Sequence, residues 1–93
     1  MTRPNWLDAV CEHYGHDPES WVPDTDGDAW TRLGEQADGE AVVSVYHHGW
    51  VWWELGSLTI HSDVHGDVLT TLIALEAAAA AFEAAIEAAR VKS

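Results

Sequence analysis

Apolar side chains first recur at helical spacing between residues 5 and 14. The residues on this apolar face are Trp6, Leu7, Val10, Cys11 and Tyr14. Their spacing predicts an amphipathic helix that Asn5 caps and Gly15 ends. The Asp17-Pro18 pair that follows predicts one further helical turn, because aspartate is a favoured cap and proline a favoured first helical residue.

Between residues 28 and 62 the pattern changes to short runs of β-branched and aromatic residues. Turn residues separate these runs, which predicts a four-stranded antiparallel meander. The predicted strands are 28–35, 41–47, 50–55 and 58–62. Alternation places on one face Val43, Val45, Trp50 and Trp52, and on the other Val42, Tyr46, Val51, Trp53 and Leu55. Because both faces are apolar, both need a covering layer.

Residues 66–91 contain neither a proline nor an internal glycine, which predicts a long C-terminal helix. One stripe of it comprises Val68, Leu72, Leu75, Ala79, Phe82, Ile86 and Ala89. Glutamates flank the stripe at Glu76, Glu83 and Glu87, and alanines occupy the far side. Alanine favours helix and also lets a second helix approach closely, so two interpretations stay open. The helix is either exposed, or packed against the N-terminal helix or another copy in a homodimer.

These elements define an α+β fold class with a short N-terminal helix, a four-stranded antiparallel meander and a long C-terminal helix. A chain of 93 residues can bury one modest core, so residues 1–93 are expected to form a single small acidic domain. The lone Cys11 excludes an internal disulfide, and its place on the apolar helix face predicts that it is buried. Residues 1–8 lack the apolar run of a secretory signal, and we expect a cytoplasmic protein.

The charge balance changes this picture most, because 16 acidic residues stand against 4 basic ones and the formal net charge is -12. Such a chain lacks the basic surface that phosphate backbones and acidic lipids require, so direct binding to nucleic acid is the function best excluded. The longest apolar tract, residues 77–82, is too short to span a bilayer, and no membrane association is expected. A surface adapted to high salt is an open alternative explanation of the acidity.

The acidic residues are concentrated between Asp8 and Glu40, where Arg32 is the only basic side chain. Aromatic residues among charges are typical of protein-binding surfaces, and this segment also holds tryptophans. The expected partner-binding residues are Asp8, Glu12, Asp17, Glu19, Trp21, Asp24, Asp26, Asp28, Trp30, Glu35, Asp38, Glu40, Glu76, Glu83 and Glu87. Three other tryptophans share one predicted strand, divide between its two faces and are expected in the core: Trp50, Trp52 and Trp53.

Part of the acidic segment resembles the calcium loop of EF-hands. The candidate metal ligands are Asp24, Asp26, Asp28 and Glu35. However, Ala29 stands where the loop needs its glycine, and Arg32 stands where a ligand or water usually faces the ion. His61 and His65 would suit zinc if both lay on one helix, but the pattern places His61 on a strand. A solvated acidic turn is the favoured interpretation.

Catalytic groups are sparse in this chain. A nucleophilic triad needs a serine or cysteine beside a positioned base, and the candidates are Cys11 and scattered histidines. Phosphate-binding glycine loops and the motifs H-E-x-x-H and C-x-x-C do not occur. We therefore expect neither an enzyme nor a cofactor.

The first functional hypothesis is a small acidic protein-binding protein whose partner is a basic, nucleic-acid-binding protein. Its sharpest form is an inhibitor that mimics nucleic-acid charge, by analogy in charge and size with the DNA-mimic anti-defence proteins of phages. The alternative is a homodimeric accessory or chaperone-like protein, joined through the long helix or the sheet, whose acidity serves solubility. A calcium- or zinc-binding module is the third hypothesis.

Overall fold

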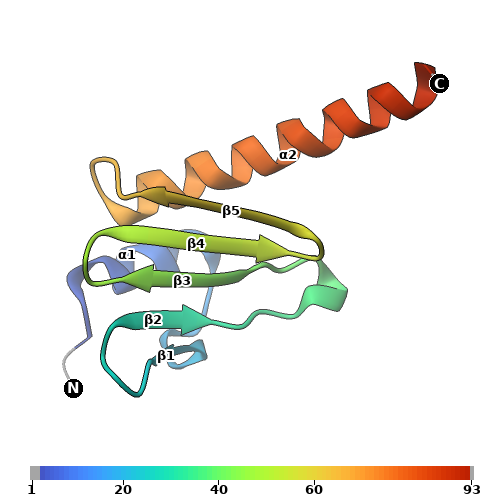
Figure 1. Ribbon diagram of the computed structural model, residues 1–93. Helices are drawn as coiled ribbons and strands as arrows, with labels where there is room; N and C mark the ends of the chain where they lie inside the picture. Colours follow the sequence, from blue (N-terminus) through green and yellow to red (C-terminus); the bar gives the residue numbers. More distant parts are fainter. Residues whose placement is uncertain (1–2, 93) are drawn as a thin grey trace.

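The computed structural model describes residues 3–92 as an α+β fold, in which two helices pack on one antiparallel sheet (Figure 1). The elements are α1 (Asn5–Tyr14), the 3-10 helix η1 (Pro18–Ser20), β1 (Trp21–Pro23), β2 (Ala29–Arg32), the 3-10 helix η2 (Gln36–Asp38), β3 (Val42–Tyr46), β4 (Trp50–Leu55), β5 (Leu58–Asp63) and α2 (Val68–Lys92). The strands form a meander in the order β1-β2-β3-β4-β5. The sequence predicted four strands, and β1 is the additional strand that it did not predict. Its three residues are too few to show an alternating pattern.

Local capping chemistry sets the ends of the first two helical segments. α1 has its predicted bounds and ends at Gly15, whose φ of 70° turns the chain so that the His16 N–H also donates to the Cys11 carbonyl, at 2.9 Å. The residue before the helix is the extended Pro4, and Asn5 is already helical, so the prediction that Asn5 caps α1 is wrong. Asp17 caps η1 as predicted, because its carboxylate accepts a 2.9 Å hydrogen bond from the Glu19 N–H.

The core lies between the helices and one face of the sheet; in Figure 1, α1 lies behind the strands and α2 runs beside β5. Leu7 and Val10 of α1 and Val51 of β4 are completely buried. The other core residues are Cys11, Trp21, Val45, Trp53, Val68, Leu72, Leu75 and Ala79. Cys11 is buried as predicted. Desolvation raises the pKa of its thiol, and the charge of Asp8 adds to the rise.

The pairing of β3 with β4 differs from the predicted one by one residue. Tyr46 lies opposite Trp50, so the hairpin loop has three residues and not the two expected at His48-Gly49. Gly49 closes it with a φ of 98° and an N–H bonded to the Tyr46 carbonyl at 3.0 Å. A slip of one residue moves every side chain of a strand to the other face. The predicted face assignments are therefore wrong for β4, and Trp53 points toward the helices.

α2 is longer than the surface on which it packs. Asp67 precedes it and accepts a 2.7 Å hydrogen bond from the Thr70 N–H. Its proximal residues Val68, Leu72, Leu75 and Ala79 are buried in the core. Every side chain from residue 80 to residue 91 is exposed, and Figure 1 shows this distal half extending beyond the sheet.

α2 also reaches the length and composition of a membrane-spanning helix. Residues Val68–Val91 have a mean hydropathy of 1.6, and 22% of the window is buried. The uninterrupted apolar tract at 77–82 is too short to predict a spanning helix, because glutamates flank it. The alanines on both sides of these glutamates nevertheless raise the mean hydropathy of the whole helix. Core helices of soluble proteins share this composition, and the buried part of α2 is core.

Candidate functional site

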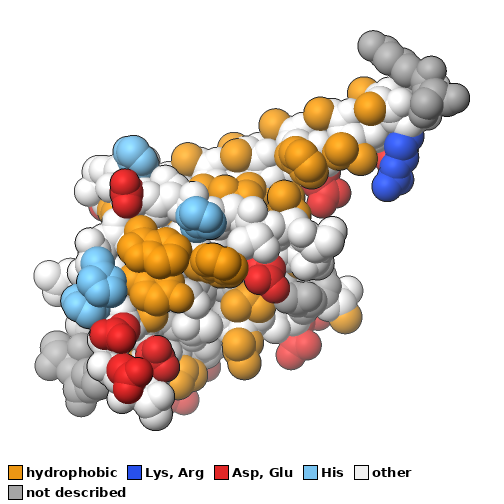
Figure 2. Space-filling model, viewed as in Figure 1, with side chains coloured by type: hydrophobic (Ala, Val, Ile, Leu, Met, Phe, Trp, Pro, Cys, Tyr) orange, Lys and Arg blue, Asp and Glu red, His pale blue; other side chains and the backbone are white. Residues whose placement is uncertain are grey.

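The face of the sheet that neither helix covers, here the open face, carries a row of aromatic rings (Figure 2). This aromatic strip consists of Tyr46, Trp50, Trp52 and His61. Tyr46 and Trp50 stack with ring centroids 4.4 Å apart and planes 10° apart, and Trp52 stacks on His61 at 5.6 Å. Alternation along β4 brings Trp50 and Trp52 to one face, and the strand neighbours supply the other two rings. The strip is a continuous π surface in which Tyr46, Trp50 and Trp52 are half-buried and His61 is exposed.

Carboxylates border the aromatic strip. Asp63 is the strand partner of Trp50. Glu54 follows Trp52 on the same face and accepts a 3.4 Å hydrogen bond from its indole N–H. Figure 2 shows further acidic side chains beside the aromatic rings. The electrostatic environment of these rings is therefore negative.

Positive charge lies on the other side of the sheet. All residues of β1 to β5 are described, and the one arginine or lysine among them is Arg32. Arg32 lies opposite Val43 in the β2–β3 pair and lines the cavity on the covered side. Because ring faces and carboxylates both attract cations, the open face suits a cationic group.

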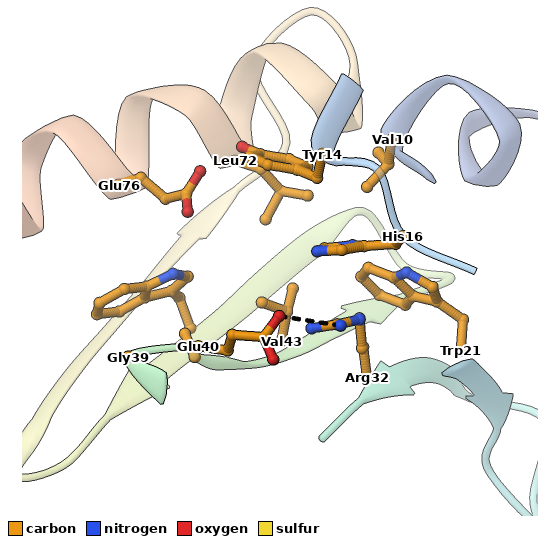
Figure 3. Close-up of a pocket in the computed structure, with 12 residues that line it drawn as sticks. Val10, Tyr14, His16, Trp21, Arg32, Gly39, Glu40, Val43, Leu72 and Glu76 are labelled. Carbon is orange, nitrogen blue, oxygen red and sulfur yellow. Dashed lines mark hydrogen bonds and ion pairs between the residues drawn. The ribbon is translucent and has the colours of Figure 1, made fainter. Parts of the chain in front are cut away.

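A cavity of about 150 Å³ lies on the covered side, between α1, α2 and the sheet (Figure 3). Its apolar wall comprises Val10, Ala41, Val43, Trp53 and Leu72. Figure 3 shows the Tyr14 hydroxyl pointing toward the Glu76 carboxylate at one side. The Arg32–Glu40 ion pair borders the opposite side. The cavity therefore combines an apolar wall with polar groups at two edges.

Three polar atoms of this cavity are buried and have no hydrogen-bond partner among the residues that the structure describes. They are the Tyr14 hydroxyl, His16 Nδ1 and Trp21 Nε1. Burial raises the pKa of Tyr14 above its ordinary value of 10.0, and the Glu76 carboxylate, toward which the hydroxyl points, adds to the rise. Burial lowers the pKa of His16, and the charge of Arg32 lowers it further. Both side chains are therefore uncharged at neutral pH.

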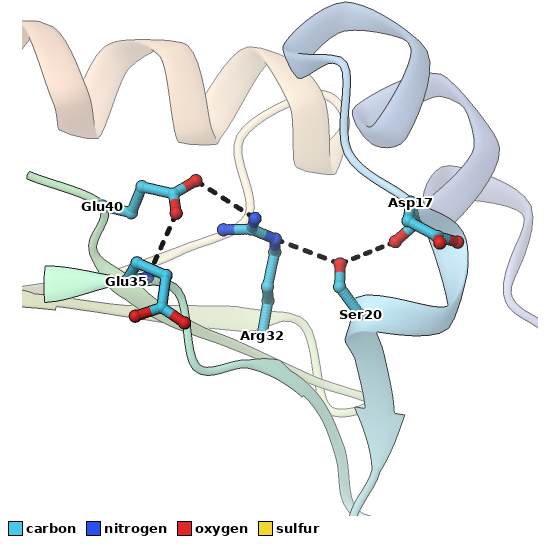
Figure 4. Close-up of polar contacts among 5 residues, drawn as sticks. All are labelled: Asp17, Ser20, Arg32, Glu35 and Glu40. Carbon is cyan, nitrogen blue, oxygen red and sulfur yellow. Dashed lines mark hydrogen bonds and ion pairs between the residues drawn. The ribbon is translucent and has the colours of Figure 1, made fainter. Parts of the chain in front are cut away.

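A polar network holds Arg32 at the cavity edge (Figure 4). Arg32 donates to Ser20 Oγ and to Glu40 Oε2, each at 3.1 Å. Ser20 donates in turn to the Asp17 carbonyl at 2.6 Å, and the Glu35 N–H donates to Glu40 Oε1 at 3.1 Å. The Glu35 N–H, and then Arg32, lower the pKa of Glu40. The network fixes the guanidinium, and its charge is balanced by Glu40.

A glycine lets the β2–β3 connection fold back onto this network. Gly34 has a φ of 65°, and a Cβ there would lie 2.6 Å from the Ala41 carbonyl oxygen. Only a residue without a side chain fits this conformation and this close approach. Gly34 thereby allows Glu40 to reach Arg32.

The structure distributes the predicted partner-binding residues over α1, η1, β1, the β1–β2 turn, β2, the β2–β3 connection and α2. Trp21 is 3% exposed, and Trp30 is half-buried on the covered face opposite Val45, so neither is an exposed anchor. Trp50 and Trp52, predicted in the core, lie on the open face. Sequence reasoning missed the aromatic strip, and the signal that could have found it is the three-residue loop that ends at Gly49.

The candidate metal ligands are held apart by β2, since Asp24, Asp26 and Asp28 precede this strand and Glu35 follows it. The Asp24 carboxylate accepts a 2.8 Å hydrogen bond from the Thr25 N–H within the turn. Among residues 3–92, no group of three or more His, Cys, Asp and Glu side chains is placed to hold a metal ion.

Comparison with protein-family models, curated proteins and solved structures finds no match to this chain. Two places in the fold carry chemistry, namely the open face with its aromatic strip and the cavity on the covered side.

Proposed function

We propose that this chain is an acidic protein-binding protein that holds a basic segment of its partner on the open face. The observation that carries the proposal is the aromatic strip bordered by Glu54 and Asp63. An arginine or lysine over a tryptophan face gains about 0.5–2 kcal/mol, and nearby carboxylates add attraction that salt weakens. An arginine-rich segment fits best, because the planar guanidinium also stacks on aromatic rings.

The net charge of -12 supports the same class of partner, because it steers a basic protein toward the chain and repels polyanions. Most carboxylates are in no ion pair with another residue of the described part of the chain; the exceptions are Asp8, Asp28, Glu40 and Glu87. The carboxylates outside these four ion pairs stay available to a partner. The finer form of the proposal is an inhibitor whose carboxylates occupy the nucleic-acid-binding surface of its target.

A deca-arginine peptide is a direct probe of the strip. We expect saturable binding to the full chain, and Trp52→Leu should weaken it about tenfold through loss of one cation–π contact. The matched control is Asp8→Asn with Glu12→Gln, which removes more charge but lies on α1 behind the sheet. Weakening by the α1 variant with no weakening by Trp52→Leu would show binding by charge alone and contradict the proposal.

The inhibitor form needs a second measurement, with a basic DNA-binding protein as target. The chain should displace duplex DNA from that target, and raising the salt concentration should weaken the complex steeply. A complex that is unchanged at high salt would rule out charge mimicry. It would leave open the aromatic contact tested with the peptide.

The distal half of α2 favours a second candidate function, a homodimeric accessory protein. Phe82 and Ile86 are 51% and 41% exposed, and they continue the stripe whose proximal part packs in the core. They border an open groove against the β4–β5 turn, with Glu83 and Arg90 at its edge. In an antiparallel pair of α2 helices, Glu83 of each copy can lie beside Arg90 of the other.

Mass measurement by light scattering tests this second candidate. A dimer should show twice the monomer mass, and Phe82→Glu should return it to the monomer mass without loss of helix content. Ala80→Glu, away from the stripe, is the matched control and should leave the dimer intact. A monomer at all concentrations of the unchanged chain would exclude this function.

A further inference from the structure

We propose that the cavity between α1, α2 and the sheet is a binding site for one neutral, ring-sized polar molecule that both donates and accepts hydrogen bonds. The site is on the covered side, so it is separate from the aromatic strip and independent of the proposed protein partner. Its volume of about 150 Å³ is that of an engineered cavity known to admit benzene.

The unpartnered polar atoms indicate a ligand with a hydrogen-bond acceptor. Trp21 is 3% exposed, and its indole nitrogen can only donate. Tyr14 offers a hydroxyl, and neutral His16 offers a nitrogen that serves as donor or acceptor according to its tautomer. A buried donor without a partner costs stability, so three such atoms around one cavity are best explained by a molecule that occupies it.

The edges of the cavity carry charges of both signs, so an ion of either sign that fills the cavity meets one like charge. Glu76 faces the Tyr14 side, so an anion would meet a carboxylate there (Figure 3). A cation would meet the Arg32 guanidinium, which its hydrogen bonds to Ser20 and Glu40 hold in place. A neutral molecule avoids both repulsions. Its acceptor can meet the Trp21 and Tyr14 donors while its donor meets Glu76.

The side chains of the wall suit an apolar ring with one polar edge. Val10, Val43 and Leu72 supply aliphatic surface, which favours burial of a ring. The stacked Tyr14 and His16 rings place their polar atoms at one boundary of the cavity. Ordered water is the competing occupant, since the same volume holds about five molecules. The experiment must therefore separate a ring-shaped ligand from water.

Three probes of equal ring size make this separation. Benzamide carries both a donor and an acceptor, benzoate is an anion with acceptors only, and benzamidine is a cation with donors only. We expect saturable benzamide binding with a dissociation constant of about 1 mM when the full chain is titrated and the NMR shifts of the Tyr14 and Trp21 signals are monitored. Benzoate and benzamidine should bind at least about tenfold more weakly.

Two conservative variants locate the bound probe. Tyr14→Phe removes one donor and keeps its ring, and Trp21→Phe removes one donor and replaces the indole with a smaller aromatic ring, so each should weaken benzamide binding about five- to tenfold. Tyr46→Phe, on the open face, is the matched control and should leave the affinity unchanged. If Trp21→Phe fails to fold, Tyr14→Phe still decides, because Tyr14 is only half-buried.

The proposal is overturned if benzamide does not saturate at about 10 mM, which would mean that water alone fills the cavity. Equal affinity for all three probes would also overturn it. So would benzamide binding that neither variant weakens. None of these results bears on deca-arginine binding, which tests a different face of the sheet.

Discussion

The two faces of the sheet use similar residues in opposite ways. Trp52 and Trp53 are neighbours in β4, yet Trp53 is 5% exposed under the helices and Trp52 lies in the aromatic strip. The difference between them is the layer that each face meets. An aromatic residue on the covered face contributes to stability by burial, whereas one on the open face keeps a π surface that a partner can use. Stability and function should therefore separate by face.

The largest expected effect compares these two tryptophans. Trp53→Ala should lower the free energy of unfolding by about 3–5 kcal/mol, because it leaves a cavity in the core. Trp52→Ala should cost about 1 kcal/mol, mostly through loss of its stack on His61. Urea denaturation of both variants measures the difference. Similar losses would mean that the open face is covered in solution, as in a sheet-mediated dimer.

A smaller effect compares two threonines. The Thr71 hydroxyl is buried in α2, accepts from the His65 N–H at 2.8 Å and donates to the Asp67 carbonyl at 2.9 Å. Thr71→Val should therefore lower the free energy of unfolding by about 1–3 kcal/mol, because it removes a buried hydroxyl that satisfies the part-buried His65 N–H.

The matched substitution on the open face is Thr31→Val. Thr31 shares a 2.8 Å hydrogen bond with Ser44 on the neighbouring strand. Water can replace this bond and valine favours strands, so a change below about 0.5 kcal/mol is expected. Chemical denaturation measures both variants. A larger loss for Thr31→Val than for Thr71→Val would reverse the contrast between the faces.

Local signals predicted the helices well. The apolar spacing and Gly15 gave the bounds of α1, and the Asp17-Pro18 pair gave η1. The absence of proline and glycine gave α2 to within two residues at each end. These features depend on interactions a few residues apart, which the sequence displays directly. The antiparallel sheet and the α+β class followed from the same reasoning.

Features that depend on pairing between strands were harder to predict. Both possible registers of β3 and β4 bury apolar residues, because Tyr46, Trp50 and Trp52 are as hydrophobic as their neighbours. A one-residue difference in loop length then decided which tryptophans became core. The cavity could not be predicted either, since Tyr14, His16 and Trp21 meet Glu76 only through tertiary packing. Charge indicated a partner class, but not the face that would meet it.

The smallest expected effect concerns pH and tests the covered side at His16. Burial, and then Arg32, lower its pKa below the ordinary value of 6.5, while Glu40 and Glu76 oppose the shift. The unfolded chain therefore binds a proton at a higher pH than the folded chain, so stability is full above pH 6.5 and falls as pH decreases toward the folded-state pKa. His16→Asn should lose less stability than the unchanged chain between about pH 7 and about pH 5.

Glu40 does not obscure this measurement. Its pKa is lowered from 4.5, so its contribution is present above that value and is lost only as pH falls through the lower folded-state pKa. Urea midpoints at the two pH values, compared between the two chains, isolate His16 because the other histidines are common to both. An identical decrease would show that the His16 imidazole is as well solvated in the folded chain as in the unfolded one. The cavity would then be open to water around this ring, and the burial contrast between the two faces would not extend to its edge.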